Sequence, residues 1–147
     1  MIIIALTFYA NINYRNIKYL DNDCSTSLIM RDRINGFYIK TNIYIDFSKD
    51  STGYLDMSGN ISINDEVYTI ARSWRFEYEF TSKDTLYLTD FKMDKRAVDN
   101  SPDDLVNKQV FNTFSNQGRY LKIGNMNGAW SIGNLYSPVF LCILRNK

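Results

Sequence analysis

A regular alternation of apolar and polar residues over the stretch 67–80 constrains the fold more than any other feature of this sequence. Alternate side chains of a β-strand point to opposite faces, so a period of two indicates a strand with one buried face. A typical strand has about 5 or 6 residues, and a run this long predicts a strand that bends as barrel strands do. The face that we expect to be buried holds Tyr68, Ile70, Arg72, Trp74, Phe76, Tyr78 and Phe80.

The same period of two recurs before and after this stretch. Asn64-Asp65 and Asn127-Gly128 are suited to two-residue hairpin turns. Short connections between consecutive strands predict antiparallel pairing. We expect further strands over 37–47, 55–63, 85–93, 120–125, 129–132 and 139–145.

One helix interrupts the strands. Ser101 is a good N-cap, Pro102 suits the first helical position, and Asp103 and Asp104 place negative charge at the positive end of the helix dipole. An apolar stripe runs to about Ser115, and Gly118 ends the helix. The chain is thus predicted to be mainly β, a small antiparallel barrel or sandwich with one α-helix around 102–115. The stripe consists of Val106, Val110, Phe111 and Phe114.

Composition argues against catalysis and against nucleic-acid binding. The chain has 147 residues, one domain's worth, and contains no His, which removes Ser-His and Cys-His nucleophiles and His-ligated zinc. Its 17 Lys and Arg against 16 Asp and Glu give a net charge of +1, without the basic excess typical of nucleic-acid-binding proteins. Glu77 and Glu79 are more typical of a solvated strand face than of a hydrolase pair. We expect no enzyme activity, metal or cofactor.

Residues 1–10, MIIIALTFYA, form an apolar run shorter than the 20 or so residues that span a bilayer. Three alternatives are open: the rear half of a membrane anchor, a signal-like region, or a buried element of the domain. We favour an anchor within residues 1–20, followed by a single domain over 21–147. Arg15 and Lys18 argue the other way, because the positive-inside rule keeps such a flank in the cytoplasm.

Cys24 and Cys142 lie near the two ends of the expected domain. In an oxidising compartment the pair is suited to a disulfide that ties those ends together. Two buried thiols in a cytosolic protein are the alternative.

Taken together, these landmarks resemble the FidL-like family of small membrane-anchored bacterial proteins, which includes the PsaF and MyfF type. The resemblance rests on the apolar start, Cys24-Ser25, and the segments YTIARSWRFEYEF, DNSPDDLVNKQVF and IGNLYSPVFLC. It implies a ToxS-like accessory protein with an inner-membrane anchor, a lipocalin-like barrel in the periplasm and no enzyme activity.

The resemblance also implies a partner. This is the periplasmic domain of a membrane-bound winged-helix transcription regulator of the PsaE or MyfE type, which controls fimbrial or virulence genes in response to a signal such as acidity. A lipocalin-type binder of a small amphipathic ligand is the alternative function. An unpaired barrel edge would offer the partner a place to add a strand.

Arg72 stands among apolar residues on the face that we expect to be buried, where a guanidinium needs an anionic or carbonyl partner. It is a candidate contact for a ligand carboxylate, and an internal salt bridge is the competing interpretation. Trp74, Phe76, Tyr78 and Trp130 are most simply core, although aromatic side chains also line ligand cavities and partner interfaces.

Four carboxylates around the start of the helix are candidates for an acid response. Crowded carboxylates can raise one another's pKa toward the working range. Helix capping and ordinary surface charge are the alternative. The four are Asp94, Asp99, Asp103 and Asp104.

Overall fold

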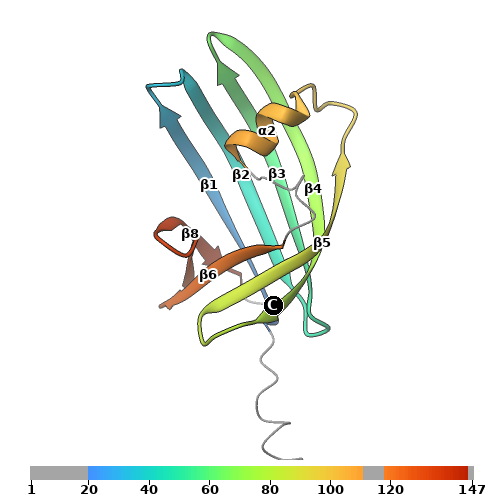
Figure 1. Cartoon of the computed structure of the whole chain (residues 1–147), viewed down its shortest axis with the longest axis vertical. Helices are drawn as coiled ribbons and strands as arrows, with labels where there is room; N and C mark the ends of the chain where they lie inside the picture. The colour runs from blue at the N-terminus through green and yellow to red at the C-terminus, as the bar shows by residue number, and fades with distance from the viewer. Residues whose placement is uncertain (1–19, 111–117, 146–147) are drawn as a thin grey trace, which may run out of the picture.

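The computed structural model describes residues 20–110 and 118–145. Eight strands pair in sequence order, and the first also pairs with the last, which closes an antiparallel barrel (Figure 1). The predicted fold class is therefore confirmed. The strands are β1 (Asn22–Asp32), β2 (Phe37–Phe47), β3 (Thr52–Ile63), β4 (Glu66–Phe80), β5 (Thr85–Lys95), β6 (Arg119–Met126), β7 (Ala129–Gly133) and β8 (Pro138–Leu144).

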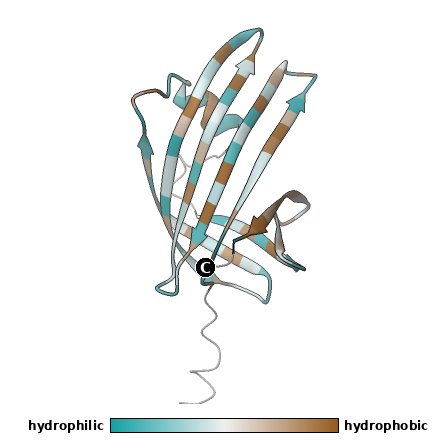
Figure 2. Ribbon diagram, turned by 180° about the vertical axis from the view of Figure 1, so that it is seen from behind, coloured by the Kyte–Doolittle hydropathy of each residue, from teal (hydrophilic) through white to brown (hydrophobic). Residues whose placement is uncertain are grey.

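Strands β2, β3 and β4 follow the alternation of the sequence, which Figure 2 shows as bands of opposite hydropathy along each strand. In β4, Ile70, Trp74 and Phe76 face inward and are at most 4% exposed, whereas Arg75 and Glu77 face solvent. Asn64 and Asp65 have φ angles of 50° and 68°, the left-handed conformation that a tight hairpin turn requires. The apolar faces of these long strands therefore determine the sheet register.

Strand β5 changes its inward face partway along. Leu86 and Leu88 point inward, and the register with β4 then shifts between Arg75 and Glu77, where Asp90 adopts a φ of 52°. The extra residue is a β-bulge, which bends a strand and increases its twist. Because of it, β5 does not keep one alternation from end to end.

Strand β1 is an element that the sequence pattern did not predict. It pairs with β2 over its whole length, from Asn22 opposite Phe47 to Asp32 opposite Phe37. Its sequence, NDCSTSLIMRD, is mostly polar, and only Asp23 and Cys24 in it are buried. A strand that buries so few side chains shows no clear period of two in its sequence. Its position in the barrel is determined instead by its pairing with β2 and by the disulfide.

The helix α2 (Asp103–Gln109) is shorter than predicted within the described residues, and its N-cap is Pro102 rather than Ser101. Ser101 is fully buried and bonds to neighbouring side chains instead. Val106 faces the core, and α2 lies across one side of the sheet of β2–β4 (Figure 1). Phe111, Phe114 and Ser115, which the prediction placed in this helix, lie outside the described residues.

Barrel closure rests on a short seam between β1 and β8. Cys24 pairs with Leu144 and Ser25 with Ile143, and a disulfide joins Cys24 to Cys142. The predicted disulfide is thus confirmed. Within the described part of the chain, no helix is long and apolar enough to cross a membrane. The segment 1–10, predicted as an anchor, lies outside the described residues.

Candidate functional site

Arg72 lies fully inside the wall of the barrel, with 1% of its surface exposed. Its Nε donates to Asp99 Oδ2 at 2.8 Å, and its Nη2 donates to Asp99 Oδ1 at 2.9 Å. Nη2 also donates to Ser101 Oγ at 2.7 Å, and Nη1 donates to Asp103 Oδ1 at 3.1 Å. The internal salt bridge considered for Arg72 is therefore present, and the chain itself supplies the counter-charges.

Asp99 also completes the edge of β4 where β5 ends. Its Oδ2 accepts a hydrogen bond from the Ala71 backbone N–H at 2.8 Å, and the Asn100 side chain accepts one from the Thr69 N–H at 2.7 Å. These side-chain oxygens replace the carbonyls of a neighbouring strand, and for the buried Ala71 N–H this satisfies a donor that would otherwise lack a partner. The segment 96–101 thereby fixes where α2 begins.

Two carboxylates in this network have lowered pKa values. Burial alone raises the pKa of Asp99, but hydrogen bonds from Arg72, Ser101 and the Ala71 N–H outweigh it and hold the pKa far below its usual range. A hydrogen bond from Lys95 is the largest cause of the lowered pKa of Asp103, and the charges of Lys95 and Arg72 add to it. The direction is opposite to the raised pKa expected from crowding, because each carboxylate has a cationic partner.

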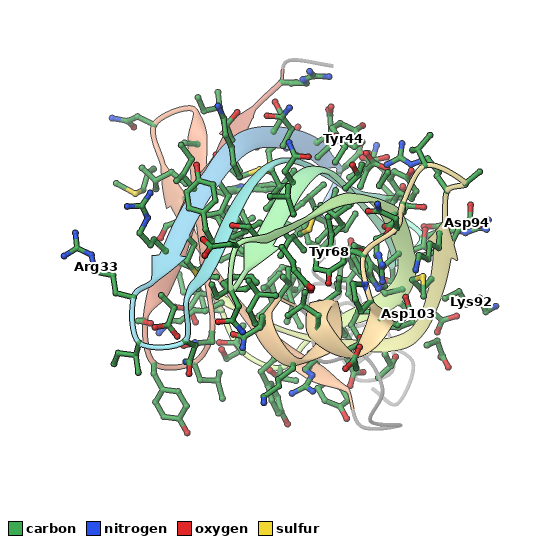
Figure 3. All side chains as sticks on the ribbon, turned by 90° about the horizontal axis from the view of Figure 1, so that it is seen from above. Arg33, Tyr44, Tyr68, Lys92, Asp94 and Asp103 are labelled. Carbon is green, nitrogen blue, oxygen red and sulfur yellow. A yellow bond between two sulfur atoms is a disulfide. The ribbon has the colours of Figure 1, made fainter. Side chains whose placement is uncertain are left out.

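The other two candidate carboxylates do not join the network. Asp94 and Asp104 are exposed, and Figure 3 shows Asp94 on the outside of β5 beside Lys92, whereas Asp103 lies at α2. Asp94 pairs in register with Ser73, one residue beyond Arg72, so the two side chains lie on opposite faces. The structure therefore brings Asp99 and Asp103 to Arg72 but leaves Asp94 and Asp104 in solvent.

The four candidate aromatic residues lie in the core. Trp74, Phe76, Tyr78 and Trp130 are each at most 4% exposed. Phe47 packs edge-on against Phe76, Tyr78 and Trp130, with ring centroids 5.9, 5.2 and 5.7 Å apart. The Tyr78 hydroxyl accepts a hydrogen bond from the Leu20 N–H and donates to the Ser48 carbonyl, each at 2.8 Å. This aromatic cluster holds the point where the chain enters the barrel.

A different part of the barrel interior from the one that holds the aromatic cluster contains a cavity. A cavity of about 390 Å³ lies among inward-facing side chains of the strands and the end of α2. Ile39, Ile43 and Met57 on β2 and β3 are at most 3% exposed at its floor. Leu28 and Met30 of β1 and Val139 and Phe140 of β8 also line it. None of these residues was a candidate in the sequence, because they look like ordinary core positions.

The wall beside this cavity is incomplete. Strand β8 reaches only Cys24 and Ser25 of β1, and β6 reaches only the stretch from Thr85 to Leu88 of β5. Among the described strands, the stretch from Thr26 to Asp32 therefore pairs with β2 alone. Ile29, within it, is 62% exposed. A strand edge with unpaired backbone groups is a template for pairing with another chain.

Comparison with known proteins gives one similarity. The model of the family described as "FidL-like putative membrane protein" matches residues 59–142. The match begins within β3 and ends in β8, so it includes Arg72, Asp99 and Cys142 but not β1. No curated protein and no solved structure matches the chain.

Proposed function

This chain belongs to the FidL-like family, and from that premise we propose that it is a periplasmic accessory subunit of a membrane-bound winged-helix transcription regulator. In this role it binds the regulator's periplasmic domain and stabilises or gates it, without chemistry of its own. The regulator controls fimbrial or virulence genes. An N-terminal anchor within residues 1–20 holds the chain in the inner membrane.

The edge of β1 that pairs with no other described strand is the observation that carries this proposal. A partner strand laid along the stretch from Thr26 to Asp32 would extend the sheet by backbone hydrogen bonds. Native proteins normally cover or interrupt such edges. Here the edge instead carries Ile29, which is 62% exposed and suits an interface that is filled by another protein.

The disulfide supports the proposed compartment. Cys24 and Cys142 are both fully buried and joined, and such bonds persist in the bacterial periplasm but are rare in cytosolic proteins. An exported domain is also what the family description, a membrane protein, favours.

Backbone direction along β1 shows how to test the edge. The Arg145 N–H donates to the Asp23 carbonyl at 3.0 Å, so the backbone groups of Asp23 point toward β8. Backbone groups alternate sides along a strand, and those of Ser27, Ile29 and Arg31 therefore point to the unpaired edge. A proline at position 29 would remove an edge donor and leave the hydrogen bonds to β2 in place.

The experiment is co-purification of the full chain with the periplasmic domain of a winged-helix regulator encoded beside it. We expect a complex with the wild type, and at least about a tenfold loss of affinity in Ile29→Pro, because strand addition depends on main-chain hydrogen bonds. Ile29→Ala is the matched control, since it keeps the backbone N–H. Equal binding by the wild type and both variants would exclude this edge, and the absence of any complex with the wild type would reject the accessory function.

The proposed signal needs a carrier other than the Arg72 network if it is acidity. Asp99 and Asp103 stay ionised through mildly acidic pH, because their pKa values are lowered. An acid response of the complex would then arise from the partner or from carboxylates at the interface.

A second candidate function is favoured by the cavity. An interior space lined by apolar side chains and open at one side is typical of a site for a small amphipathic ligand. This function is compatible with the first, since the cavity and the β1 edge share Leu28 and Met30.

A further inference from the structure

The cavity has an unusual lining for a chain so rich in aromatic residues. The aromatic cluster of Phe47, Phe76, Tyr78 and Trp130 fills another part of the interior, and none of its members lines the cavity. The described lining is instead mainly aliphatic, with contributions from every strand except β4. Its inward members include Leu28, Met30, Ile39, Ile43, Leu55, Met57, Leu88, Leu121 and Ile132.

The floor of the cavity is apolar and buried. Ile39, Met57 and Ile132 are at most 2% exposed and belong to three different strands. Flexible and branched aliphatic groups of this kind pack well around methylene groups, and methionine in particular adapts its shape to a ligand. The volume of about 390 Å³ lies in the range of small-molecule sites. Such a space suits an aliphatic chain.

Few polar side chains line the cavity. Gln109 at the end of α2, Arg119 at the start of β6 and Asn134 after β7 contribute to its wall. Arg119 is partly exposed, and it is the single charged side chain in the described lining. Guanidinium groups recognise carboxylates and phosphates by charge-assisted hydrogen bonds. The described lining is therefore mostly apolar, and its one cationic side chain is partly exposed.

We infer that this cavity binds a single aliphatic chain that carries an anionic headgroup. The chain lies against the floor formed by Ile39, Met57 and Ile132, and the headgroup meets Arg119. This assignment rests on the second proposed function and names its ligand class. A free fatty acid and a lysophospholipid both have this chemistry, and their headgroups distinguish them in the test.

The test uses the full chain, purified, stripped of lipid and kept free of detergent, with binding followed by calorimetry. The probes are saturated fatty acids from decanoic to hexadecanoic acid, the matching alcohols, and lysophosphatidylglycerol. Each methylene that enters the cavity should raise the affinity roughly fourfold until the cavity is full, after which the affinity should level off. Acids should bind at least about tenfold more tightly than alcohols of equal length.

Adjacent residues of β1 give a matched pair of variants. Leu28 points into the cavity, whereas Ile29 points outward and is 62% exposed. Leu28→Trp should abolish chain binding, and Ile29→Trp should leave it within about twofold of the wild type. Val110→Trp, from the end of α2, fills the same cavity from another element if Leu28→Trp does not fold. Arg119→Gln should remove the preference for acids over alcohols without changing the gain per methylene.

Each outcome supports or overturns the ligand class, the role of Arg119 or the second proposed function. Binding of fatty acids or of lysophosphatidylglycerol that Leu28→Trp removes supports the assignment and identifies the source. Binding of a rigid polycyclic acid such as cholic acid, with none of the chains bound, overturns the ligand class but keeps the amphipathic binder. Failure of every probe, cholic acid included, rejects the second proposed function as well. Equal affinity for acids and alcohols in the wild type overturns the role of Arg119.

Discussion

Arg72 and Asp99 form a two-hydrogen-bond ion pair in which neither side chain is more than 1% exposed, with Nε to Oδ2 at 2.8 Å and Nη2 to Oδ1 at 2.9 Å. The pair joins the middle of β4 to the segment that leads into α2. Because Asp99 also accepts the Ala71 N–H, one carboxylate links the sheet edge, the buried cation and the start of the helix.

Asp99→Asn should strongly destabilise the domain. The substitution leaves the Arg72 guanidinium buried without its main counter-charge, and breaking a buried ion pair from one side costs about 3–5 kcal/mol. The free energy of unfolding in urea measures this loss. Asp94→Asn is the control, because Asp94 is exposed, and it should change stability by less than about 0.5 kcal/mol. Similar losses in the two variants would contradict the role of the pair.

The same carboxylate should make stability depend on pH only in strong acid. The folded pKa of Asp99 lies below its ordinary value of 3.8, so its contribution is complete above that pH. The contribution is lost as the pH falls further, toward the folded pKa. Urea unfolding of the wild type should therefore vary little through Asp99 between about pH 7 and 5 and lose stability below about pH 4. Asp99→Asn should lose less below pH 4, and an equal loss would contradict this assignment.

Loss of the disulfide should open the seam between β1 and β8. The bond closes a loop with a sequence separation of 118, and the seam otherwise consists of two residue pairs and the hydrogen bond from the Arg145 N–H to the Asp23 carbonyl. For a loop of this length the chain-entropy model gives a cost of about 4–5 kcal/mol. Urea unfolding of the Cys24→Ala, Cys142→Ala double variant measures the cost. A reductant should lower the stability of the wild type but not of the variant, and no effect on either would argue against closure by this bond.

Gly59→Ala should be costly because β3 crosses β2 closely at this point. A Cβ at position 59 would lie 2.2 Å from the Lys40 carbonyl oxygen and 2.6 Å from the Thr41 Cα. Both are backbone atoms of β2, so the strands must separate, and we expect a loss of about 1–3 kcal/mol in thermal or urea unfolding. Gly124→Ala is the control, since its Cβ would lie 3.6 Å from the nearest atom, Ser131 Cβ. Comparable losses would mean that the strands adjust freely.

Local patterns predicted the long strands well, because the alternation of residues along a strand follows directly from which side chains are buried. The prediction worked for β2, β3 and β4, where one face is apolar over most of the strand. It failed for β1, whose residues are largely polar because one edge of the strand and much of its surface remain outside the core. It also misassigned Ser101, whose hydroxyl fits a helix cap but bonds to Arg72 and Asp99.

The sequence by itself determined the class of fold and the buried position of Arg72. It also made a disulfide between the two cysteines available. These follow from side-chain period and residue chemistry, which are local. Only the tertiary structure decided which carboxylate meets Arg72, which stretch of β1 pairs with β2 alone among the described strands, and that a cavity lies beside it. Those features depend on strand lengths, register and closure, which bring together residues far apart in the chain.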